Sequence, residues 1–132
     1  MQIVIMPPEL YTIISQGISL MNVIAAKAQQ DNNNPESVKL CSGELQRSVR
    51  SLLKVQECEF SPKGWQQYTA ILSEINGTAS ELAECCEDSE SVRQLTGGNL
   101  KTLLVQLGEV LEGERPEIRG KSFFERIKER FQ

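Results

Sequence analysis

The chain has 132 residues, of which 39% are hydrophobic and 24% are charged, and it contains no histidine. This length fits one ordinary domain that buries a core without disulfides, and the composition excludes collagen-like and fully disordered chains. The net charge of -4 argues against a general nucleic-acid-binding surface. Since histidine is the commonest general base and metal ligand, we expect a protein that is not an enzyme and holds no metal or cofactor.

The charge is divided unevenly along the chain. Residues 1–114 carry 8 basic and 15 acidic side chains, whereas residues 115–132 carry 6 basic and 3 acidic ones. An acidic body is therefore followed by a basic tail. Such asymmetry points to electrostatic docking, either on another molecule or back onto the same one.

The chain has four cysteines, Cys41, Cys58, Cys85 and Cys86. They lack the spacing of a metal site, since the sequence has no CxxC and no histidine. We expect small apolar residues in a reducing compartment, with a regulatory disulfide or reactive thiol as the alternative. No apolar run approaches the roughly 18 residues that span a bilayer, and no secretory signal is recognisable. The sequence therefore predicts a cytoplasmic protein.

The first helix is expected over about residues 8–30, where apolar side chains recur every three or four residues. This stripe consists of Leu10, Ile14, Gly17, Met21, Ile24 and Ala28. Four further apolar side chains widen it, so we expect this helix to be the most buried: Ile13, Ile18, Leu20 and Val23. A second helix should begin with Asn34 as N-cap and Pro35 at its first position, and end near Glu57 and Cys58.

The third helix has the best-defined start in the sequence. Ser61 is the expected N-cap, Pro62 follows it, and Phe60 and Trp65 are spaced for a hydrophobic staple. Its apolar seam repeats at alternating spacings of three and four residues, as in a coiled coil. The seam consists of Trp65, Tyr68, Leu72, Ile75, Ala79, Leu82 and Cys86. These side chains are expected in the core rather than on a ligand-binding surface.

The fourth helix is expected from about Ser89 to Leu111, and the Gly97-Gly98 pair predicts a kink or local break within it. Four long amphipathic helices with short connections predict an all-α fold, an up-down-up-down four-helix bundle over residues 1–112. A linker over residues 113–121 should lead to a short amphipathic helix over residues 122–132. The capping box from Ser122 to Glu125 marks the start of that helix.

An acidic cluster is expected at the end of the third helix and in the turn that follows it. Glu81, Glu84 and Asp88 are spaced to share one helix face. Metal-binding carboxylate bundles draw acids from several helices, usually with Glu-x-x-His, and this sequence has no such set. A solvated face is the simpler interpretation, and a docking patch for a basic element is the alternative.

The C-terminal helix carries the sharpest functional signal. Four apolar side chains fall within an arc of about 100° on a helix: Phe123, Phe124, Ile127 and Phe131. Basic side chains lie along the same segment: Lys121, Arg126, Lys128 and Arg130. This pattern is typical of a segment that lies in the interface of an anionic membrane or on a protein partner. The alternative is a helix that covers its own bundle.

The layout resembles the N-terminal four-helix bundle of the mixed lineage kinase domain-like family, whose fold is related to fungal HeLo domains. The resemblance covers residues 9–112, and its most suggestive pieces are Glu74-Ile75-Asn76-Gly77 and Gln94-Leu95-Thr96. It implies a membrane-directed cell-death or defence effector that is restrained by brace helices and released on oligomerisation. The segment after Gly113 would take the brace position. The acidic body and the missing sensor domain depart from the family and weigh against lipid activity of the bundle itself.

These features together predict a non-enzymatic bundle module that associates with a membrane or a protein partner through its C-terminal helix and that self-associates. The other candidate is a soluble adaptor or regulatory subunit whose tail docks on its own bundle or on a partner helix.

Overall fold

The computed structural model describes residues 6–114. The elements are helical throughout this range: α1 (Pro8–Gln30), α2 (Pro35–Leu53), the 3-10 turn η1 (Glu57–Glu59), α3 (Pro62–Glu84), α4 (Ser89–Gln94), the π-helical turn η2 (Leu95–Asn99) and α5 (Leu100–Gly113). Because α4, η2 and α5 follow one another without a gap, they form one long helical segment. The predicted all-α class and the four helices are confirmed for the described residues.

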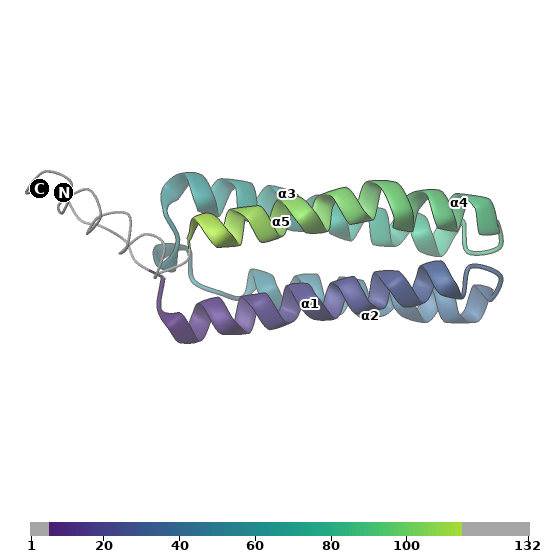
Figure 1. Ribbon diagram of the computed structural model, residues 1–132, viewed down its shortest axis with the longest axis horizontal. Coiled ribbons are helices and arrows are strands. Elements are labelled where there is room, and N and C mark those ends of the chain that lie inside the picture. Colours follow the sequence, from purple (N-terminus) through teal and green to yellow (C-terminus); the bar gives the residue numbers. More distant parts are fainter. Residues whose placement is uncertain (1–5, 115–132) are drawn as a thin grey trace, which may run out of the picture.

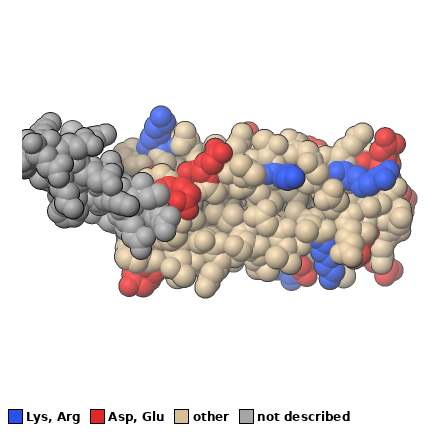
Figure 2. Space-filling view, viewed as in Figure 1, with Lys and Arg blue, Asp and Glu red and all other residues tan. Residues whose placement is uncertain are grey.

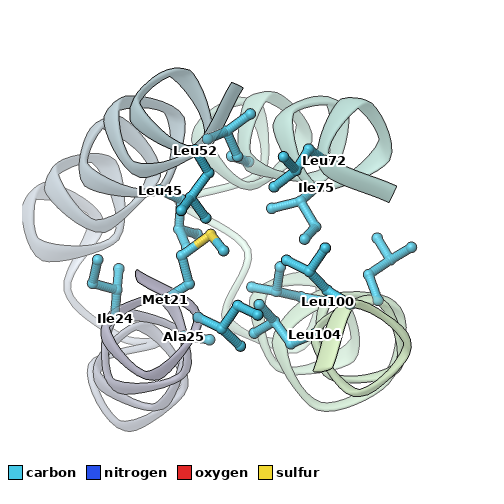
Figure 3. Packing of buried hydrophobic residues seen from close by; sticks show 14 of the residues in the cluster. Met21, Ile24, Ala25, Leu45, Leu52, Leu72, Ile75, Leu100 and Leu104 are labelled. Atoms are coloured by element: carbon cyan, nitrogen blue, oxygen red, sulfur yellow. The ribbon is translucent and has the colours of Figure 1, made fainter. Parts of the chain in front are cut away.

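The four helical segments surround one core. Contacts join α1 with α2, α2 with α3, α3 with α5, and α5 with α1. In Figure 1 the segments lie alongside one another and are connected at alternate ends, so successive segments run in opposite directions. The described chain begins and ends at the same end of the molecule. Figure 3 shows apolar side chains from all four segments pointing into the shared interior.

Side-chain caps fix two helix starts, as the sequence predicts. The Asn34 side chain accepts a hydrogen bond from the Ser37 N–H at 3.2 Å at the start of α2. The Ser61 hydroxyl accepts one from the Gly64 N–H at 3.1 Å at the start of α3. The rings of Phe60 and Trp65 meet edge to face, 5.4 Å between centroids, which confirms the predicted staple.

Helix α2 ends at Leu53, so the predicted end near Glu57 and Cys58 is wrong. The 3-10 turn η1 occupies that segment instead. It delivers Phe60 to the core, where this side chain is 3% exposed. The Phe60 ring packs against Trp65 and Tyr68 of α3, so the chain has already left the direction of α2 at this point.

The predicted core stripe of α1 is confirmed, but its predicted widening is largely wrong. Ile18 is buried, whereas Ile13 is 58% exposed, Leu20 53% and Val23 65%. Each helix of a four-helix bundle presents only one arc to the core. Since α1 contacts α2 on one side and α5 on the other, an apolar stripe outside that arc faces away from the bundle.

The interruption predicted at Gly97-Gly98 takes the form of the π turn η2. Buried side chains follow here at spacings of four residues: Val92, Thr96, Leu100 and Leu104. On a regular α-helix each such step would rotate the buried face by about 40°. The wider π turn rotates less per residue and offsets that drift, so α4 and α5 both face the core.

Candidate functional site

The membrane or partner contacts predicted from sequence all lie outside the described residues: Lys121, Phe123, Phe124, Arg126, Ile127, Lys128, Arg130 and Phe131. The chain passes to them from the end of α5. For this candidate site the structure therefore shows the place where the chain leaves the bundle, at the end of α5.

Glu114 anchors that departure point. Its side chain is 3% exposed. The carboxylate accepts hydrogen bonds from the Ser61 hydroxyl and, at 3.3 Å, from the Ser61 N–H. Glu114, which directly follows α5, is thereby held against Ser61, the N-cap residue of α3. A carboxylate is well placed here, because the N-terminus of a helix carries a partial positive charge.

Gly64 makes room for the Glu114 carboxylate in the first turn of α3. A Cβ atom at this position would overlap Oε1 of Glu114 and would lie 2.8 Å from the Ser61 hydroxyl oxygen. Only glycine fits without displacing one of these groups. Ser61 and Glu114 are 53 residues apart in the sequence, and no local pattern identifies their contact, so sequence reasoning misses it.

An aromatic cluster lies at the same end of the bundle. Phe60 and Tyr68 have centroids 4.5 Å apart, and Trp65 and Tyr68 have centroids 5.8 Å apart. The Tyr68 hydroxyl donates a 2.5 Å hydrogen bond to the Leu52 carbonyl. Burial raises the pKa of Tyr68. Tyr68 is a core residue, as predicted. Through these contacts the cluster packs the connection between α2 and α3.

The predicted acidic patch lies at the opposite end of the bundle (Figure 1). Glu81 and Glu84 are exposed and border a hollow of about 420 Å³, together with Cys85, Ser91, Gln94 and Leu95. The expectation that Asp88 shares their helix face is wrong, because α3 ends at Glu84. The Asp88 carboxylate instead caps α4, accepting from the N–H groups of Glu90 and Ser91.

These hydrogen bonds, together with one from the Ser91 hydroxyl at 2.9 Å, lower the pKa of Asp88. Its charge is thus committed to local structure. The predicted residues that do share one face of α3 are Glu81 and Glu84.

The four cysteines are free thiols. Cys41 and Cys86 are buried, Cys85 is half-buried and Cys58 is exposed. Burial is the main cause that raises the pKa of both Cys41 and Cys85, which favours the protonated, less nucleophilic thiol. Across residues 6–114, no group of three or more acidic, cysteine or histidine side chains is placed to hold a metal ion.

None of the helices between residues 6 and 114 is long and apolar enough to cross a bilayer. No family model, curated protein or solved structure matches the chain.

Proposed function

We propose that the chain is a non-enzymatic helical-bundle module that binds an anionic membrane surface through its amphipathic C-terminal segment. The observation that carries this proposal is the pattern of residues 121–131, an apolar arc of three phenylalanines and one isoleucine among four basic side chains. On this view the protein is cytoplasmic and attaches peripherally to the membrane.

The energies fit reversible binding. Burying a Phe or Ile side chain stabilises by about 1.5–3 kcal/mol, so the four apolar side chains supply a gross gain of about 6–12 kcal/mol. Each basic side chain near an anionic surface adds about 1 kcal/mol. Ordering about ten residues into a helix consumes much of this gain, because short isolated helices are marginal. The segment is therefore expected to bind weakly by itself.

The bundle supports this proposal by holding in place Glu114, from which the chain continues toward the segment. The contact of Glu114 with Ser61 fixes the last residue before the tail to the N-terminal end of α3. A membrane-bound tail would thus bring the bundle to the surface by one defined end.

Docking of the tail on the predicted acidic patch of its own bundle would need an extended linker. The open acidic patch, Glu81 and Glu84, lies about 30 Å along α3 from Ser61, at 1.5 Å per residue. The seven residues 115–121 span at most about 25 Å even when fully extended. The basic side chains of the predicted helix could therefore reach this patch only with the linker nearly fully extended, whereas a membrane can meet them beside the end of the bundle that the chain leaves.

Vesicle co-sedimentation tests the proposal. The full chain should pellet with vesicles of equal parts phosphatidylcholine and phosphatidylserine, and much less with phosphatidylcholine alone. The variant with Phe124→Ser, Ile127→Ser and Phe131→Ser should stay in the supernatant. Val105→Ser is the control, because Val105 is an exposed apolar side chain on α5, and this variant should pellet like the wild type. Equal pelleting of wild type and triple variant would overturn the proposal.

The adaptor alternative gives a different result. If the segment covers its own bundle, the triple variant should lose more than about 2 kcal/mol of stability, as expected when buried apolar side chains are removed. A tail that binds a membrane leaves the stability of the bundle nearly unchanged.

A further inference from the structure

The outward face of α1 is apolar and carries almost no charge. Ile13, Leu20 and Val23 are each more than half exposed. Residues 10–26 contain no acidic or basic side chain, and Figure 2 shows the surface over α1 as largely uncharged. Depletion of charge with retained apolar side chains is the compositional mark of the centre of a protein interface.

These side chains belong to a longer stripe with the geometry of a coiled-coil seam. The stripe consists of six exposed residues at spacings of 4, 3, 4, 3 and 4: Glu9, Ile13, Gln16, Leu20, Val23 and Lys27. At 100° per residue they fall within an arc of about 80°. The bundle uses a different arc of α1 for its core, which contains Ile14, Met21 and Ala28. A second helix could therefore pack along the stripe without disturbing the fold.

The order of residues in the stripe identifies the partner. If a second copy of α1 packs antiparallel so that residue numbers facing each other sum to 36, Glu9 faces Lys27 of the second copy. Ile13 then faces Val23, and Gln16 faces Leu20. Both ends of the seam carry opposite charges in contact, and each layer between them contains at least one apolar side chain. A parallel pairing would instead place Glu9 against Glu9 and Lys27 against Lys27.

We propose that a second copy of this chain docks on the outward face of α1 and forms an antiparallel, two-fold symmetric dimer. Such an interface is self-complementary, since the same residues serve both copies. Its six stripe residues per copy are fewer than the 20–30 of a standard interface, so a dissociation constant of about 10–100 µM is expected.

The dimer forms without lipid, and it would strengthen lipid binding by the tail. The antiparallel arrangement places the two C-terminal segments at opposite ends of the dimer. One flat surface that engages both segments would hold the dimer more tightly than either segment alone.

Sedimentation equilibrium in the absence of lipid tests the dimer. The wild type should show a monomer–dimer equilibrium over loading concentrations from about 5 to about 500 µM, a range that brackets the expected constant. Leu20→Glu should raise the dissociation constant at least about tenfold by placing a charge in the seam. Val105→Glu is the matched control, since Val105 is 54% exposed and Leu20 is 53% exposed. Circular dichroism should show equal helicity in both variants. A wild type that stays monomeric throughout, or equal dimerisation of the two variants, would overturn the proposal.

Charge exchange tests the antiparallel register. Glu9→Lys and Lys27→Glu should each weaken dimerisation about three- to tenfold, because each variant creates two like-charge contacts per dimer. The double variant should recover the wild-type constant. Failure of the double variant to recover would contradict the proposed register. Since lipid is absent from these measurements, their outcome is separate from that of the vesicle experiment.

Discussion

The contact between Glu114 and the first turn of α3 gives a quantitative prediction. Glu114→Ala removes the acceptor of the Ser61 N–H and hydroxyl. Loss of a charged acceptor for partly buried donors costs about 2 kcal/mol. For a folded region of about 100 residues this lowers the melting temperature by about 8 °C, at about 4 °C per kcal/mol.

Gly64→Ala should cause a similar loss through the same contact. The new Cβ would displace the Glu114 carboxylate and crowd the Ser61 hydroxyl, 2.8 Å away. The greater helix propensity of alanine returns up to about 1 kcal/mol, which roughly offsets the crowding. The net expected loss is again about 2 kcal/mol. Because both substitutions remove the same interaction, their effects should not add. The double variant should therefore lose about 2 kcal/mol rather than about 4 kcal/mol.

Chemical denaturation monitored by circular dichroism measures the free energy of unfolding of the wild type, the two single variants and the double variant. Gly77→Ala is the control, because a Cβ at Gly77 of α3 meets no atom within 4 Å. This variant should gain up to about 1 kcal/mol from helix propensity. Additive losses in the double variant, or a Gly64→Ala variant as stable as Gly77→Ala, would refute the assigned contact.

Three further predictions concern other parts of the bundle. Hydrogen bonds lower the pKa of Asp88, so its charged form stabilises the fold above the unfolded pKa, and that contribution is lost as pH falls through the lowered value. The difference in melting temperature between wild type and Asp88→Asn should therefore change below about pH 4 and stay constant above about pH 5; a constant difference throughout would contradict the cap. Gly17→Val should cost about 1–3 kcal/mol in urea denaturation, because even its Cβ would lie 2.8 Å from a Leu52 methyl carbon. Unchanged stability would disprove this close approach. A thiol reagent should label Cys58 quickly in the native protein and Cys41 only after unfolding; equal rates would contradict their assigned burial.

Local sequence signals account for much of the fold. The caps at Asn34 and Ser61 and the staple of Phe60 with Trp65 act over a few residues, so the starts of α2 and α3 can be predicted from the sequence. The core stripe of α1 can likewise be predicted, because apolar side chains recur every three or four residues. Gly97 and Gly98 indicate an interruption, although its π-helical form depends on how the helix packs.

Other features depend on contacts that local patterns do not encode. Apolar side chains cover more than one arc of α1, and only its packing against α2 and α5 decides that Ile13 and Leu20 face outward. The role of Glu114 depends on a serine far away in the sequence. The spacing of Asp88 from Glu84 suggests one helix face, yet the carboxylate serves as a cap because α3 has already ended.

Hydrogen exchange of the full chain, with and without vesicles, tests the proposed function most directly. In free protein the amides of residues 122–131 should exchange quickly, and anionic vesicles should slow their exchange while neutral vesicles should not. Equal exchange with and without anionic vesicles would contradict membrane binding by this segment. Strong protection already present in free protein would instead support docking on the bundle.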